Sequence, residues 1–178
     1  MNITGIVAEY NPYHNGHQYL TAKCREAGAT HVVAVMSGNF VQRGSVAIMD
    51  KRARAKAALS DGVDLVLELP VPWAVSTAEL FARGGLSVLS GLGCVDSLAF
   101  GCETADKELL FKAAEAVCDI KVHDLIKDEL DGGITYAAAR ENAVRKLYGD
   151  EIASSQNGIL QTNSYQNSQC NFRRNVFR

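Results

Sequence analysis

Four short apolar runs recur through the first hundred residues, and a segment of helical pattern separates each run from the next. The runs cover 3–8, 30–38, 64–70 and 96–101. Runs of this length with β-branched residues and Gly, Asp or Pro at their ends are typical of strands. Strands that alternate with helices predict a parallel sheet covered on both faces. The pattern therefore favours the α/β class, with a doubly wound parallel sheet.

The segments between the runs carry recognisable helix signals. A helix is expected over 17–27, and Asp50 is a suitable N-cap for the segment KRARAKAAL that follows it. A further helix is expected over 75–92, and the pattern is helical again from 106 to 148. We expect residues 1–150 to form one domain with a helical C-terminal region.

The composition changes after Asp150. Of the 28 residues in 151–178, 14 are Asn, Gln, Ser or Thr, and no apolar periodicity continues beyond Leu160. Segments of this kind lack the apolar side chains that a packed core requires. We expect 151–178 to be a polar, poorly ordered tail.

Length and charge exclude several classes of protein. With 178 residues and 47% hydrophobic side chains, the chain can bury a core of ordinary domain size. The net charge of −2 excludes a histone-like polycation, but the charge is unevenly spread. Residues 1–60 carry 7 basic and 3 acidic groups, whereas 61–151 carry 8 and 17. The N-terminal third is therefore the positive end of the sequence.

The cysteines and the N-terminus indicate a reducing compartment. The five cysteines include no C-x-x-C pair, so neither a disulfide framework nor a zinc ribbon is indicated. No signal peptide precedes the first strand, and no apolar run is long enough to span a bilayer. We expect a cytoplasmic protein that does not enter a membrane.

An H-x-G-H string follows the first predicted strand at the start of the next helix. It consists of His14, Gly16 and His17, and the composition of the chain predicts roughly 0.007 such strings by chance. The loop after the first strand of a parallel sheet is a common phosphate contact. Glycine allows close approach of the backbone, and imidazoles with helix N–H groups can donate to a polyphosphate. We interpret the string as a nucleotide site in which His14 and His17 are catalytic, rather than as a pair of capping residues.

A basic segment follows the second predicted strand, at the same edge of the sheet. Five of the seven basic groups in 1–60 belong to it, namely Arg43, Lys51, Arg52, Arg54 and Lys56. They could contact RNA phosphates, and the alternative is a solvated helix face. Trp73 and Phe81 are expected to be packing residues rather than platforms for a base. One carboxylate near the histidines, Glu9, is too few for a ligand set, so no protein metal ligands are assigned.

Four blocks of the sequence together resemble the bacterial tRNA(Met) cytidine acetate ligase family, within the HIGH-motif nucleotidyltransferase superfamily. The blocks are GIVAEYNPYHNGH (5–17), VMSGNFVQRGSVAIMDKRARAKAAL (35–59), DGVDLVLELP (61–70) and VDSLAFGCE (95–103). They appear in the family's order, and the resemblance extends from residue 1 to about residue 160.

The resemblance implies a Rossmann-like fold and an ATP-dependent ligase. Such an enzyme activates acetate as acetyl-adenylate, with Mg²⁺ carried on the nucleotide, and acetylates N4 of the wobble cytidine of elongator tRNA(Met). By position, it also assigns Gly101 and Asn157 to the nucleotide. The implied ATP loop consists of Val7, Ala8, Glu9, Tyr10, Asn11, Pro12, Tyr13, His14, Asn15, Gly16, His17, Gln18, Tyr19 and Leu20.

Beyond about residue 160 the sequence departs from the family pattern. The family supplies a later arginine to the ATP site, and neither Arg173 nor Arg174 lies in a matching motif. Two alternatives to the ligase remain open. One is a small-molecule adenylyltransferase, and the other is a shortened nucleotide- or tRNA-binding protein without turnover.

Overall fold

A computed structural model describes residues 1–101, 107–154 and 169–173, the last of these only as a strand. The chain divides into two compact units. One comprises Met1–Gly101 with Tyr165–Arg178, and the other comprises Cys102–Ser164. The sequence-based division into a domain over 1–150 and a tail over 151–178 stays a prediction. The prediction of disorder in the tail falls mainly on residues outside those described.

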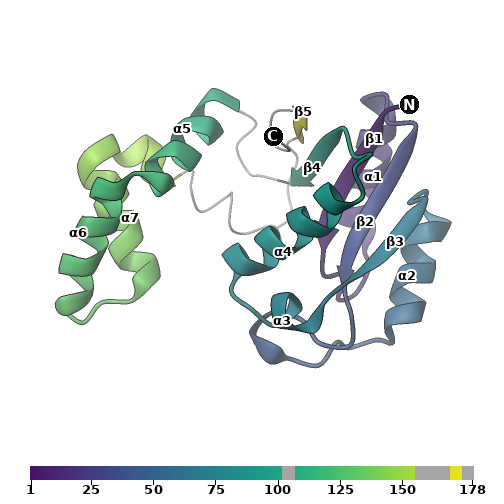
Figure 1. Cartoon of the computed structure of the whole chain (residues 1–178), viewed down its shortest axis with the longest axis horizontal. Helices are drawn as coiled ribbons and strands as arrows, with labels where there is room; N and C mark the ends of the chain where they lie inside the picture. Colours follow the sequence, from purple (N-terminus) through teal and green to yellow (C-terminus); the bar gives the residue numbers. More distant parts are fainter. Residues whose placement is uncertain (102–106, 155–168, 174–178) are drawn as a thin grey trace. The chain divides into compact units, whose positions relative to one another are not determined.

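The first unit is built on one sheet (Figure 1). Its four parallel strands are β1 (Ile3–Ala8), β2 (His31–Ser37), β3 (Leu65–Leu69) and β4 (Ser97–Gly101), in the order β3-β2-β1-β4. The predicted runs match these strands to within a residue or two, and the predicted doubly wound, Rossmann-like α/β fold is confirmed. A fifth strand, β5 (Gln169–Arg173), pairs antiparallel with β4, and no strand was expected there.

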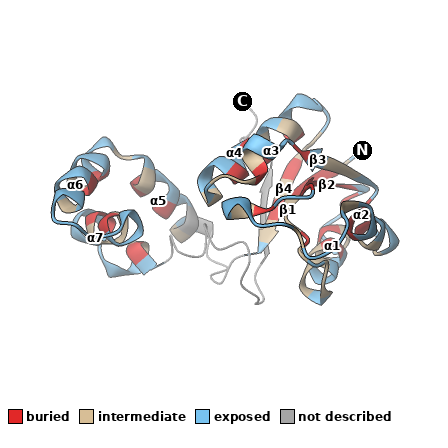
Figure 2. Cartoon of the chain, turned by 90° about the horizontal axis from the view of Figure 1, so that it is seen from below, coloured by how far each residue is buried: buried red, intermediate tan, exposed pale blue. Residues whose placement is uncertain are grey.

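Helices cover both faces of the sheet. The helices are α1 (Asn15–Glu26), the short 3-10 turn η1 (Gln42–Gly44), α2 (Lys51–Ser60), α3 (Val71–Ala74) and α4 (Ala78–Gly91). Cys24 of α1 and Ala58 of α2 pack with Val32, Ala34 and Met36 of β2 on one face. α3 and α4 pack on the opposite face, and buried residues line the strands between the two layers (Figure 2).

Local signals explain where the helices begin. Asp50 is the N-cap of α2, and its carboxylate accepts the backbone N–H of Arg52 at 2.8 Å, as the sequence predicts. The helix expected over 75–92 is preceded by the separate short helix α3, which has proline in its first turn. Phe81 is 4% exposed and packs in the core with Trp73, so both are packing residues, as predicted.

The helices with described bounds in the second unit are α5 (Lys107–Cys118), α6 (Ile120–Asp131) and α7 (Tyr136–Tyr148). Its core is made of small and β-branched side chains, including Val122, Ala139 and Val144, each of which is completely buried. Thr135 caps α7 by accepting the backbone N–H of Ala138. Across the described part of both units, no helix combines the length and the apolar character that crossing a bilayer would require.

Candidate active site

The strand order of the sheet reverses at β1. The chain places β2 and β3 on one side of β1 and then places β4 on its other side. Open α/β sheets bind ligands beyond the carboxyl ends of their strands at such a switch point. Gly5 of β1 lies opposite Leu98 of β4, and counting three residues on brings Gly101 level with Ala8. Gly101 and the loop after β1 therefore border the same edge of the sheet.

His14 and His17 lie together at the start of α1, where the loop after β1 ends. His14 is the N-cap residue, with an extended backbone (φ −148°, ψ 171°), and His17 lies in the first turn. Their imidazole rings are stacked, with centroids 3.6 Å apart and planes inclined by 18°. The two histidines of the sequence motif therefore form one structural unit.

The contacts of His17 determine its protonation state. Its Nδ1 accepts the backbone N–H of His14 at 3.3 Å, which leaves the ring proton of the neutral form on Nε2. Burial, together with the neighbouring His14, lowers the pKa of His17 to about 3. Burial also lowers the pKa of His14. At neutral pH His17 is an uncharged imidazole whose Nε2–H can donate a hydrogen bond.

The N-terminus of α1 supplies further donors at the same place. The first N–H groups of a helix have no partners within the helix, and the helix dipole favours an anion there. The first turn of α1 contains no acidic residue that would repel an anion. Imidazole and backbone donors thus converge where a phosphate group can be bound.

Two tyrosines pack against His17. The Tyr10 ring meets the His17 ring edge-on at 4.8 Å, and the Tyr13 ring lies 5.0 Å from Tyr10 and 5.5 Å from His17. Tyr10 is 1% exposed, and burial raises the pKa of its hydroxyl above the ordinary value. Its backbone has a positive φ of 49°, which L-residues rarely adopt. This packing removes water from His17 and so keeps its imidazole neutral.

Two side chains of the loop after β1 hold the neighbouring loop 39–49. The Glu9 carboxylate accepts the backbone N–H of Gln42 at 2.7 Å, and the Asn11 side-chain oxygen accepts that of Ile48 at 2.8 Å. Both Glu9 and Asn11 belong to the ATP loop implied by the family resemblance. The structure therefore joins the histidine loop to the segment that precedes the basic helix α2.

Arg54 is buried, whereas the sequence predicts that it is exposed and contacts RNA. Its side chain is 1% exposed, and its guanidinium donates to the backbone carbonyls of Met49 at 3.0 Å, Glu9 at 2.8 Å and Ser37 at 3.1 Å. It also donates to the carbonyl of Gly38. A guanidinium enclosed in this way cannot reach a phosphate outside the protein. The assignment of Arg54 to an RNA surface is therefore corrected.

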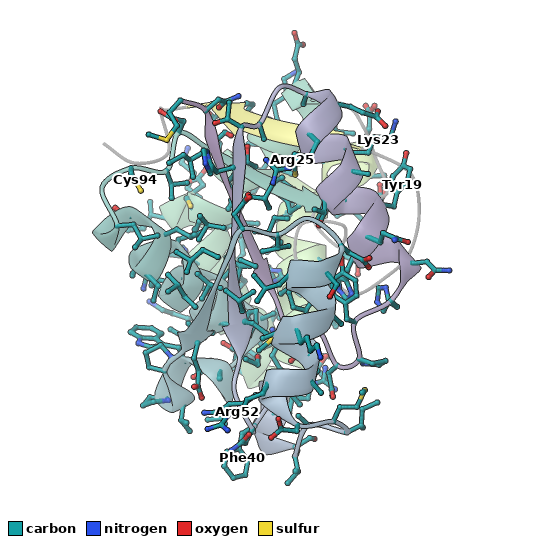
Figure 3. The ribbon with its side chains drawn as sticks, turned by 90° about the vertical axis from the view of Figure 1, so that its right-hand side faces the viewer. Tyr19, Lys23, Arg25, Phe40, Arg52 and Cys94 are labelled. Carbon is teal, nitrogen blue, oxygen red and sulfur yellow. The ribbon has the colours of Figure 1, made fainter. Side chains whose placement is uncertain are left out.

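The other four basic residues lie at or near the surface. Arg43, Arg52 and Lys56 are exposed, and Lys51 forms an ion pair with Glu68 at 2.7 Å. Figure 3 shows Arg52 and Arg25 at opposite ends of the sheet. Their contact with RNA stays a prediction.

The remaining predicted ATP-site residues fall into three groups. Val7 and Ala8 end β1, and Gly16 lies in the first turn of α1. Leu20 packs against the core of the α1 and α2 face. The exposed residues are Pro12, Asn15, Gln18, Tyr19 and Gly101, with Tyr19 beside the Lys23 ammonium (Figure 3).

Asn157 lies outside the described residues. Within the described parts of the chain, no group of three or more His, Cys, Asp or Glu side chains is arranged to hold a metal ion.

The chain is similar to known proteins over most of its length. A family model described as HIGH Nucleotidyl Transferase matches residues 1–175. Two tRNA(Met) cytidine acetate ligases, from Acetivibrio thermocellus and Caldanaerobacter subterraneus, are 44% and 48% identical over 168 and 167 residues. These matches cover 90% and 92% of this chain, which spans only 40% and 41% of the length of the relatives.

A solved structure has the same fold. The crystal structure of Thermotoga maritima TmcAL bound with alpha-thio ATP superposes with a TM-score of 0.82 at 39% sequence identity. The match covers 91% of this chain and 42% of that one. The resemblance drawn from the four sequence blocks is confirmed.

Proposed function

The chain belongs to the HIGH nucleotidyl transferase family, and on this premise we propose that it is the nucleotide-activating part of a tRNA(Met) cytidine acetate ligase. The observation that carries the proposal is the stacked pair of His14 and His17 at the switch point of the sheet. Identities of 44% and 48% to two such ligases, over nine-tenths of this chain, support the choice of substrates.

The reaction has two steps. An acetate oxygen attacks the α-phosphorus of ATP and pyrophosphate leaves, which gives acetyl-adenylate. The N4 amine of the wobble cytidine in elongator tRNA(Met) then attacks the acetyl carbon, and AMP leaves. The Nε2–H of His17, the His14 ring and the N-terminus of α1 donate to phosphate oxygens as negative charge develops. Mg²⁺ enters with ATP, and a bacterial tRNA substrate places the enzyme in the cytoplasm.

The nucleotide is proposed to lie between the loop after β1 and the end of β4. Gly101 ends β4, and no atom of the described residues lies within 4 Å of the position that a Cβ would take there. That space allows a base or ribose to approach the backbone directly. Asn157 is retained in the proposal on the family resemblance alone.

The tRNA is proposed to contact Arg43, Lys51, Arg52 and Lys56. Three observations support this surface: exposure of three of its four members, its position beyond the carboxyl end of β2, and its hydrogen-bonded link to the histidine loop through Glu9. Lysine and arginine side chains at such a surface neutralise backbone phosphates.

Pyrophosphate exchange tests the proposal. The chain is incubated with ATP and labelled pyrophosphate, together with acetate, phosphopantetheine or nicotinate mononucleotide. Acetate-dependent exchange is expected. Exchange with a phosphorylated metabolite but not with acetate would identify a small-molecule adenylyltransferase, and ATP binding without exchange would identify a binding protein without turnover.

Substitution of the histidines links the exchange to the proposed site. His14→Ala and His17→Ala are each expected to lower acetate-dependent exchange by about 10²–10³, because donors to the developing charge are lost. His123→Ala, at an exposed position in α6, serves as the matched control. Wild-type exchange rates in both site variants would overturn the assignment of His14 and His17.

A further inference from the structure

Arg54 gathers backbone carbonyls from three separate segments of the first unit. Its acceptors are the carbonyl oxygens of Glu9 after β1, of Ser37 and Gly38 at the end of β2, and of Met49 before α2. The first three mark the carboxyl ends of two adjacent strands. One planar guanidinium, with five N–H donors in fixed directions, can satisfy such a set.

These carbonyls lie where an anionic ligand is expected. Carbonyl oxygens carry partial negative charge, so oxygens turned towards a polyphosphate would oppose its binding. The hydrogen bonds to Arg54 turn three of them towards a buried cation. The loop after β1 is then free to present the imidazoles and the helix N–H groups to the ligand.

The charge of Arg54 is itself part of the local electrostatics. Burial lowers the pKa of Arg54, while Asp50, Glu9 and Glu68 raise it. An arginine side chain stays protonated in proteins. The positive charge of Arg54 is thereby fixed next to the Glu9 carbonyl, in the loop that leads to the histidines.

A short chain of contacts connects Arg54 with His17. Arg54 fixes the carbonyl of Glu9, and the next residue is Tyr10, whose backbone has φ 49°. The Tyr10 ring packs on His17 at 4.8 Å. A shift of the Glu9 carbonyl would therefore move the Tyr10 ring, which shields His17 from water.

We propose that Arg54 is a positioning residue for the nucleotide site, which holds the ends of β1 and β2 so that the histidine loop takes its binding geometry. The proposal rests on the ATP site of the proposed function. It assigns to Arg54 a role in ligand binding in addition to its contribution to the fold.

Arg25 provides a matched control, because it also binds backbone carbonyls but at the opposite edge of the sheet. Its guanidinium donates to the carbonyls of Ala29 and Gly62 at 3.3 and 2.9 Å and to Asp64 at 2.6 Å. These acceptors lie at the amino ends of β2 and β3. Arg25→Met and Arg54→Met both remove an arginine that supports the fold, but only Arg54→Met alters the carboxyl edge.

The experiment measures ATP affinity by calorimetry in the folded variants. Arg54→Met is expected to weaken ATP binding by at least about tenfold, since small misplacement of binding groups is costly. Arg25→Met is expected to bind ATP within about twofold of wild type, the scatter allowed for a substitution outside the site. Arg54→Lys keeps the charge but not the planar set of donors, and its affinity should fall between the two.

A second readout reports the position of the loop without ATP. Nitrogen NMR of the histidine rings gives the tautomer and titration of His17, which should change towards those of an exposed histidine in Arg54→Met but not in Arg25→Met. If Arg54→Met does not fold, Arg54→Lys carries both measurements.

The outcomes separate the two proposals. A folded Arg54 variant with wild-type ATP affinity and wild-type His17 titration would overturn the positioning role. Failure of the wild-type chain to bind ATP would overturn the proposed function, while the His17 titration would still decide whether Arg54 positions the loop.

Discussion

At the scale of single residues, the candidate site uses a histidine that its surroundings keep uncharged. A charged imidazole would attract phosphate more strongly, but burial beside Tyr10 and the acceptor role of Nδ1 both favour the neutral form. The neutral His17 ring has a fixed tautomer, with its Nε2–H as the hydrogen-bond donor. Such preorganised donors act on charge that develops in the transition state.

Neutral His17 should make the chain sensitive to acid. The pKa of His17 is about 3 in the folded chain and about 6.5 in an unfolded one. Between these values the unfolded state binds a proton that the folded state does not, so the free energy of unfolding rises with pH. The contribution of neutral His17 to the free energy of unfolding is complete above about pH 6.5 and is lost as the pH falls towards 3. Over this range the free energy of unfolding changes by up to about 1.4 kcal/mol per pH unit.

Urea unfolding at a series of pH values from 4 to 7 measures this slope. His17→Gln should have a flatter dependence than wild type. His123→Gln removes an exposed histidine and should keep the wild-type slope. Equal slopes in all three proteins would mean that His17 is not buried in its neutral form.

Gly101 offers a steric test of the nucleotide position. Because a Cβ at Gly101 meets no atom of the described residues within 4 Å, Gly101→Val should leave the protein folded. Valine is also favoured in strands. ATP affinity, measured by calorimetry, should nevertheless fall by about tenfold or more, since the side chain would occupy space near the nucleotide. Unchanged affinity would place ATP away from the end of β4.

The sequence places His14 and His17 together after the first strand, as the structure does, but it does not predict the contacts of Arg54. The residues of the H-x-G-H string are close together in the sequence, so a local pattern is enough to recognise them. The acceptors of Arg54 come from positions 9, 37, 38 and 49, and no local pattern connects these positions. One signal was available: Arg54 and Ala58 are four residues apart and form the buried face of α2.

At the scale of elements, strands and caps were predictable and the loops were not. The four parallel strands have clear apolar runs, and Asp50 marks the start of α2. The loop 39–49 takes its form from hydrogen bonds to Glu9 and Asn11, which are remote in sequence. In the strand Gln169–Arg173, Cys170 and Phe172 alternate with polar residues, but this short run lies in a segment dominated by Asn, Gln and Ser, so the expectation of a polar tail missed it.

The packing of α4 on the sheet depends on a glycine. A Cβ at Gly85 would lie within 2.7 Å of Cγ2 of Val7, a stiff β-branched side chain at the core. Gly85→Ala should therefore destabilise the fold, because overpacking of about 1–3 kcal/mol exceeds the roughly 1 kcal/mol gained in helix propensity.

Gly91 is the control within the same helix. A Cβ there meets no atom within 4 Å in the described part of the chain, so Gly91→Ala should be neutral or stabilising. Thermal unfolding of the two variants measures the difference. A Gly85→Ala protein as stable as Gly91→Ala would show that α4 can move away from β1 without cost.

At the scale of the whole molecule, charge is segregated along the chain. Residues 1–60 have a net charge of +4, although the complete chain has −2. Among the basic residues of the proposed tRNA surface, Lys51 is engaged with Glu68, whereas Arg52 and Lys56 are exposed on α2. Arg43, Arg52 and Lys56 are therefore the candidates for contacts that depend on salt, and Arg52 and Lys56 share the helix α2.

Reversal of these two charges tests the tRNA surface. If Arg52 and Lys56 neutralise phosphates, the double variant Arg52→Glu, Lys56→Glu should bind tRNA(Met) more weakly. The dependence of log affinity on log salt concentration should become shallower by about 0.9 for each lost contact if the bound region is double-stranded, and by about 0.7 if it is single-stranded. ATP affinity should remain close to wild type, since neither Arg52 nor Lys56 belongs to the predicted ATP loop and salt weakens the effect of exposed charges.

The matched control makes the same change in net charge elsewhere. Lys121 and Lys127 are exposed on α6, in the acidic part of the sequence. Their reversal to glutamate should lower tRNA affinity less and should keep the salt slope, because a loss of net charge alone removes no phosphate contact. Equal slopes in wild type and in the Arg52 and Lys56 variant would show instead that this face of α2 is only solvated. The phosphate contacts of tRNA would then have to lie on other residues.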